Sequence, residues 1–227
     1  MNRSLLAMLA TILLSFSVHA ANSGSAPGDT SAWSEGGLQK TTIKGLDVVY
    51  ARPGASLAEY HKVLLSPIEV SFNRDWERRE VPGSRRRISA SDSQAIKDRL
   101  SKLVREELTK ELAAGGYQVV DSAGDDVLEV HMAIVNLYVT APKVTGSGNV
   151  DTFAVTAGQM SLVAELRDSV TGDVIARLFD HAAAREWPWA RRVTSVDNAA
   201  EASAITREWA KILREQLDLA KGIGAKP

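Results

Sequence analysis

The sequence predicts an α+β fold, a two-layer sandwich in which a mostly antiparallel sheet of about five to six strands carries two long helices on one face. Residues 127–139 contain apolar positions that recur with a period of two, residues 158–183 have the pattern of a hairpin, and two further stretches carry apolar residues at helical spacing. Strands joined in hairpins, with only two helices, favour this architecture over a doubly wound fold.

The stretch 127–139 is expected in the middle of the sheet, because a helix pattern precedes it and another follows it. Its apolar positions recur with a period of two, which is typical of a half-buried strand. Leu128, Val130, Met132 and Ile134 alternate with Glu129, His131, Ala133 and Val135. One face of this strand should therefore belong to the core.

Two shorter strands are expected earlier in the chain. Residues 46–50 are β-type and end in the turn sequence Ala51-Arg52-Pro53-Gly54. Residues 63–72 carry apolar side chains on one face, but Pro67 lacks the backbone donor that a strand ladder needs. This second strand should lie at an edge or be broken by a bulge.

The two helices are predicted from apolar stripes and capping residues. Ser91 with Gln94 fits a capping box, and Gly115-Gly116 can end the first helix; Asp197 can cap the second helix, which extends to about Leu219. The first stripe is Ile96, Leu100, Leu103, Val104, Leu108 and Leu112, and the second is Ala202, Ile205, Trp209, Ile212, Leu213 and Leu217.

The remaining strands surround the central one in sequence. Residues 117–120 resume a strand after the first helix, and residues 123–125 turn the chain into the stretch 127–139. Residues 158–183 form the hairpin, with turn-forming residues at 169–173. Its two strands should pair antiparallel.

Composition indicates one ordinary globular domain, residues 38–227. Apolar residues make up 44% and charged residues 24% of the 227-residue chain, and the formal net charge is −1, which gives no indication of nucleic acid as a partner. The chain has no cysteine, so disulfides, thiolate catalysis and cysteine-based zinc sites are excluded.

The N-terminus has the pattern of a secretory signal at residues 1–20. Arg3 supplies the positive start, an apolar run follows, and the small residues before Ala21 fit cleavage after Ala20. The alternative is a membrane anchor, but Ser15 and Ser17 interrupt an apolar run that is shorter than the ~20 residues of a spanning helix. We therefore expect an exported periplasmic protein with no integral membrane span, in which residues 21–37, rich in Ser, Gly and Ala, form a flexible linker.

Known catalytic motifs are absent from the sequence. His61, His131 and His181 are scattered, without the close pairing of a metal site, and there is no GxSxG, P-loop or GxGxxG sequence. No metal or cofactor is expected.

Two irregular segments combine arginine with tryptophan and are the candidate binding site. Guanidinium groups recognise carboxylates and phosphates, and tryptophan stacks on sugars, cations or partner side chains. The alternative is that the charges are merely solvated and that the tryptophans cover the second face of the sheet. The candidate residues are Arg74, Trp76, Arg78, Arg79, Arg85, Arg86, Arg87, Arg185, Trp187, Trp189, Arg191 and Arg192. Because both segments join a strand to a helix, we expect them to emerge at the same end of the sheet and form one surface.

The sequence resembles an uncharacterised family of exported bacterial proteins, the domain of unknown function 3313 (DUF3313). The resemblance lies in residues 50–55 running into 60–65, in 116–121, and in 166–169 with 171–172, and it covers most of residues 46–219. Members of that family often look like lipoproteins with a cysteine at the end of the signal. Because this chain has none, a free periplasmic protein is expected; the resemblance implies no activity and no catalytic residue.

The expected function is that of a non-enzymatic periplasmic binding or accessory domain of the bacterial cell envelope. Its partner would be an envelope protein or an anionic envelope component, such as a phosphorylated glycolipid headgroup or a peptidoglycan carboxylate. The alternative is a periplasmic enzyme of the hydrolase class, whose site the sequence does not reveal. Three polar side chains converging in one closed pocket would favour the enzyme, and an exposed sheet edge or Arg/Trp surface would favour the binding domain.

Overall fold

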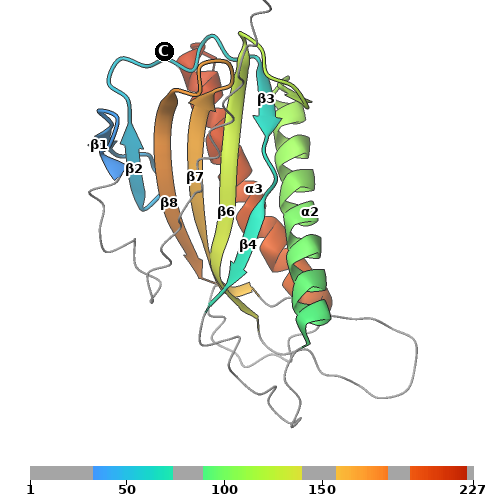
Figure 1. The fold of residues 1–227 in the computed structure, drawn as a ribbon. Coiled ribbons are helices and arrows are strands. Elements are labelled where there is room, and N and C mark those ends of the chain that lie inside the picture. The colour runs from blue at the N-terminus through green and yellow to red at the C-terminus, as the bar shows by residue number, and fades with distance from the viewer. Residues whose placement is uncertain (1–32, 74–88, 140–156, 184–194, 224–227) are drawn as a thin grey trace, which may run out of the picture.

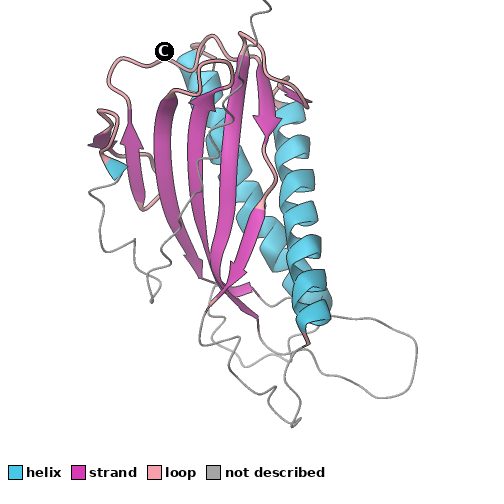
Figure 2. Cartoon of the chain, in the orientation of Figure 1, coloured by secondary structure: helices cyan, strands magenta, loops and turns pink. Residues whose placement is uncertain are grey.

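A computed structural model describes residues 33–73, 89–139, 157–183 and 195–223 of the chain. The strands are β1 (Gln39–Thr41), β2 (Val48–Ala51), β3 (Lys62–Leu65), β4 (Glu69–Phe72), β5 (Gln118–Val120), β6 (Val127–Val139), β7 (Ala157–Asp168) and β8 (Val174–Ala183), and the helices are α2 (Ala90–Ala114) and α3 (Ser195–Ala220). The α+β class and the placement of both helices on one face are confirmed (Figure 1, Figure 2).

The described strands form one mixed sheet, which is larger than the sequence predicted. Seven of its eight described strands follow the order β1-β2-β8-β7-β6-β3-β5, and the eighth, β4, pairs with β6 beside this path. The prediction of five to six mostly antiparallel strands was wrong because β3 pairs in parallel with both β5 and β6, and β4 pairs in parallel with β6. The helix α2 connects β4 to β5 and carries the chain back along the sheet, so that β5 runs in the same direction as β3 and β4. The strands β1 and β5 have only three residues each, which is too few for a period of two to be recognised in the sequence.

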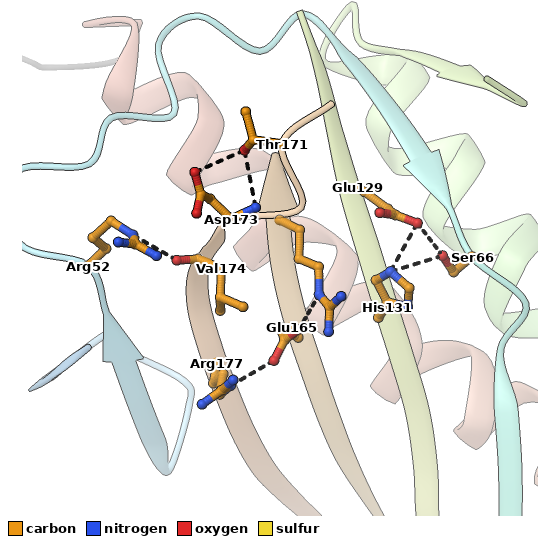
Figure 3. A network of polar contacts seen from close by, with 10 residues as sticks. Arg52, Ser66, Glu129, His131, Glu165, Thr171, Asp173, Val174 and Arg177 are labelled. Atoms are coloured by element: carbon orange, nitrogen blue, oxygen red, sulfur yellow. Dashed lines mark hydrogen bonds and ion pairs between the residues drawn. The ribbon is translucent and has the colours of Figure 1, made fainter. Parts of the chain in front are cut away.

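The strand β6 lies inside the sheet, between β7 and the β3–β4 segment, as its alternation predicted. Leu128, Val130, Met132 and Ile134 are all buried in the core that the sheet shares with the two helices. Their neighbours Glu129 and His131 point to the opposite, open face of the sheet (Figure 3).

The predicted strand 63–72 is broken at Pro67 into β3 and β4, which both run along β6. The break would leave strand carbonyls without partners, and Arg105 of α2 supplies the missing donor. Its Nη2 atom donates to the carbonyl oxygens of Leu65 at 2.8 Å and Ser66 at 3.1 Å. The helix therefore stabilises the irregular backbone that the proline imposes.

We expect Arg105→Met to lower the free energy of unfolding by about 1.5–3 kcal/mol, because the variant keeps the apolar stem but loses a charged donor shared by two carbonyls. Urea unfolding of the purified protein measures this change. The matched control Lys110→Met, at an exposed position on the same helix, should stay within about 0.5 kcal/mol of the wild type. An equal loss in both variants would contradict the role given to Arg105.

Both helix starts lie earlier than the sequence analysis placed them. The N-cap of α2 is Ser89, whose Oγ accepts from the backbone N–H of Asp92 at 3.1 Å, rather than Ser91. The helix α3 begins at Ser195, so Asp197 lies within its first turn instead of capping it. The sequence offers several serines and aspartates at each start, and a capping pattern alone does not select among them.

Two predicted turns are confirmed. The backbone N–H of Ala55 donates to the carbonyl of Arg52, and Gly54 adopts a φ of 76° that other residues disfavour. The hairpin of β7 and β8 pairs antiparallel, and Oδ1 of Asp168 accepts from the backbone N–H groups of Val170 and Thr171 in the turn between them.

Contacts with the folded body begin at Trp33 among the described residues, within the segment that composition assigned to a linker. Trp33 is buried, and its ring lies 6.2 Å from that of Tyr50 between centroids.

Candidate functional site

The predicted Arg/Trp site lies outside the described residues. Its first seven members fall between residues 74 and 88, and the other five fall between residues 184 and 194. Their convergence into one surface therefore stays a prediction.

The described elements on either side of these segments do end at one end of the molecule. The strands β4 and β8 both run parallel to β6, since β4 pairs with it directly and β8 is related to it through two antiparallel pairings. The carboxyl ends of β4 and β8 and the starts of α2 and α3 lie together at the lower end of the view (Figure 1). This arrangement is compatible with a shared surface.

The open face of the sheet carries a cluster that resembles a catalytic triad in composition. Nε2 of His131 lies 2.9 Å from Oε1 of Glu129 and 3.5 Å from Oγ of Ser66, and that hydroxyl also donates to Glu129 at 3.0 Å (Figure 3). In a working triad the acid binds one ring nitrogen and the nucleophile the other. Here both neighbours use the same nitrogen, so the geometry does not favour a serine hydrolase.

A second cluster on this face is centred on Glu165 of β7. The carboxylate is almost fully buried, with 1% exposure, although it lies on the face opposite the helices. Its Oε2 accepts from Nε of Arg177 at 2.7 Å, and its Oε1 pairs with Nε of Arg167 (Figure 3). Glu165 on β7 is the register partner of His131 on β6 and of Arg177 on β8. Its ion pair with Arg177 therefore joins two adjacent strands near the centre of the sheet.

A hollow among the described residues lies on the other side of the sheet, against α3. It is a cavity of about 310 Å³, within the size range of small-molecule sites. Its walls are mostly apolar and come from the end of β1, from β2, β6, β7, β8 and α3, from the loop between β1 and β2, and from the loop after β2. They include Val49, Val130, Met132, Leu162, Leu166, Leu178, Trp209, Ile212 and Leu213, and Arg52 is the only charged residue among them.

Small side chains on adjacent strands create this cavity. Ala51 and Ala176 are register partners on β2 and β8, and Ala164 of β7 pairs with Leu178. All three face α3 at positions where other rows of the sheet carry leucine, valine or methionine. The missing carbons leave space between the helix and the sheet.

Two loops complete the cavity walls. In the loop between β1 and β2, Gly45 has a φ of 90°, and a Cβ at that position would lie 2.9 Å from Cδ1 of Ile212. The positive φ therefore favours glycine at this point of the loop, and the lack of a side chain leaves room for the terminal methyl of Ile212. The loop after β2 is tied down by Tyr60, which is buried and whose hydroxyl donates to Oδ2 of Asp168 at 3.0 Å.

The indole of Trp209 is held against the cavity by Asp180 of β8. Its Nε1 donates to Oδ2 of Asp180 at 2.7 Å. Burial raises the pKa of the Asp180 carboxyl above its usual range, because the ionised form loses solvation there, even though the indole bond acts in the opposite direction.

We expect Asp180→Asn to raise the melting temperature at pH 7, because asparagine can still accept from Trp209 without a desolvated charge. An acid whose pKa is higher in the folded protein binds its proton more tightly there, so stability falls as pH rises from about 4 through the folded pKa. The gain should therefore disappear below about pH 4, where aspartate is neutral in both states. Thermal melts at both pH values test this, and a gain of equal size at both would contradict the assignment.

Sequence reasoning did not find this cavity. Its walls were expected as core positions, and the one available signal was the set of alanines at core-facing strand positions.

Among the described residues, no three His, Asp or Glu side chains gather as a metal site, and no described helix is long and apolar enough to cross a membrane.

Comparison with solved structures gives distant matches. PelC from Paraburkholderia phytofirmans, a dodecamer, shares 14% identity, with 71% of this chain and 97% of that one covered and a TM-score of 0.34. Protein XCC0632 from Xanthomonas campestris shares 13%, with 76% and 91% covered and a TM-score of 0.40. A minor lipoprotein from Acinetobacter baumannii shares 12%, with 74% and 98% covered and a TM-score of 0.34.

No curated protein matches the chain. The family described as "Protein of unknown function (DUF3313)" matches residues 32–213, which is most of the chain and includes every strand and α2, together with most of α3. The chain therefore belongs to the DUF3313 family.

Proposed function

We propose that this protein is a non-enzymatic binding or accessory protein of the bacterial cell envelope, and that it holds the apolar part of a ligand in the cavity between α3 and the sheet. The observation that carries the proposal is the cavity itself, with a volume of about 310 Å³ and mostly apolar walls. A core that only had to be stable would fill such a space, because each unfilled volume forfeits packing contacts.

The composition of the cavity walls favours binding over catalysis. A hydrolase needs a nucleophile and a base within hydrogen-bond reach of each other. The polar residues of the walls are Thr41, Thr42, Arg52 and Gln216, which offer neither a histidine nor a carboxylate. The alternative of a periplasmic hydrolase finds no support in this site.

Binding of a neutral apolar fluorophore, 1-N-phenylnaphthylamine, tests the proposal. The wild type should enhance the emission of the dye, and Ala176→Phe should weaken binding by about tenfold or more, because the ring occupies the space beside Ala51. The control Ala113→Phe, at an exposed position on α2, should bind like the wild type. Equal binding by both variants would overturn the cavity as the site, provided that both variants melt as folded proteins.

The envelope part of the proposal rests on the signal-like sequence at residues 1–20. We expect the mature protein to begin at Ala21 and to be released with the periplasmic fraction. Intact-mass measurement of the protein recovered by osmotic shock tests this. A retained signal, or recovery only with membranes after a high-salt wash, would mean that the apolar run is an anchor.

The Arg/Trp segments are proposed as a second contact region for an acidic partner or an anionic envelope component. Crosslinking in the intact envelope, followed by identification of the partner, tests it. A triple alanine variant of Arg85, Arg86 and Arg87 should lose the crosslinked partner at low salt, where exposed charges are least screened.

A further inference from the structure

We propose that the ligand of the cavity is an amphiphile with an apolar part and an anionic headgroup, and that Arg52 binds that headgroup. This inference rests on the proposed function. It adds the charge of the ligand and the residue that recognises it.

The first support is the position of Arg52 in an otherwise uncharged wall. Of the residues that line the cavity, it alone carries a charge, and no aspartate or glutamate is among them. A ligand with a positive headgroup would meet repulsion, and a ligand without a polar end would leave the guanidinium unused.

The second support is the way in which the backbone fixes this side chain. The N–H of Arg52 donates to the carbonyl of Ile175 at 2.8 Å, and its Nε donates to the carbonyl of Val174 at 2.9 Å (Figure 3). The turn at Pro53 and Gly54 follows immediately and holds the residue at the end of β2. The guanidinium is therefore preorganised, which lowers the entropy lost on binding.

The third support is the free hydrogen-bonding capacity that this arrangement leaves. A guanidinium has five N–H donors, and only the one on Nε is used within the part of the chain that the structure describes. The terminal nitrogens can therefore donate two parallel bonds to a carboxylate or a phosphate, which is the geometry that arginine recognises best. The neutral side chains of Thr41, Thr42 and Gln216 add further hydrogen-bonding groups to the wall.

The test compares ligands that share one chain but differ in headgroup. Decanoate, decyl phosphate and decan-1-ol are titrated against the full-length mature protein loaded with 1-N-phenylnaphthylamine, and displacement of the dye is measured. We expect at least one of the two anions to displace the dye about tenfold more tightly than the alcohol, which corresponds to one charge-assisted contact. A preference between decanoate and decyl phosphate identifies the headgroup as a carboxylate or a phosphate monoester.

Variants then assign the preference to Arg52. Arg52→Gln should bind all three ligands like the alcohol, and Arg52→Lys should keep part of the preference for anions. Lys44→Gln removes an exposed positive charge in the loop between β1 and β2 that does not line the cavity, and it should change nothing. Thermal melts confirm that each variant is folded.

Two results would overturn the inference and leave the proposed function intact. The first is equal displacement by the anions and the alcohol in the wild type, and the second is a preference for anions that persists in Arg52→Gln. If instead no ligand displaces the dye and Ala176→Phe binds the dye normally, the proposed function itself fails.

Discussion

Leu108→Ala on α2 is expected to lower the free energy of unfolding by about 2–5 kcal/mol, because it removes buried carbons and leaves a cavity that its neighbours fill only in part. Leu108 is 1% exposed and belongs to the core that α2 shares with the sheet. A domain of this kind is stable by about 5–15 kcal/mol, so the loss is a large fraction of the total. Urea unfolding of the purified protein measures it.

Leu103 on the same helix is the matched control. The sequence analysis placed both leucines on one apolar stripe, but Leu103 is only partly buried at the margin of the core. Leu103→Ala should therefore cost clearly less than Leu108→Ala, because less apolar surface leaves the core and water can relieve the remaining space. Equal losses would contradict the placement of Leu108 inside the core and of Leu103 at its margin.

The long elements could be predicted because their periods are strong and local. The period-two pattern of residues 128–135 identifies β6 without reference to anything it contacts, and the hairpin of β7 and β8 carries its own turn residues. The strand β1 and the strand β5 have three residues each, so they exist only because a partner strand extends them. The parallel pairing of β3 with β6 depends on where α2 returns the chain, which no local pattern encodes.

The candidate site could be predicted far less well than the fold. A cavity is a shortage of volume among several elements, and Ala51, Ala164 and Ala176 come together only through the register of three strands. Arg52 was visible in the sequence only as part of a turn. Its role follows from where the end of β2 lies relative to Val174 and α3.

The Glu165 cluster depends on register in the same way, and its removal should have the other large effect. Glu165→Ala should lower the free energy of unfolding by about 3 kcal/mol or more, because it leaves two arginine side chains facing a buried position without their carboxylate. Those side chains are only 22% exposed at Arg167 and 23% exposed at Arg177, so water can compensate only in part. Urea unfolding at moderate salt measures the loss.

A triple variant separates the penalty for removing the carboxylate from beside two arginines from the loss of packing. In Glu165→Leu/Arg167→Met/Arg177→Met the whole cluster becomes apolar at similar volume, and replacement of a complete buried ion cluster is often neutral or stabilising. The triple variant should therefore be more stable than Glu165→Ala, although it contains more substitutions. If it is the less stable of the two, the cluster stabilises the sheet through the attraction between its charges. The explanation by arginines that lose the Glu165 carboxylate would then be wrong.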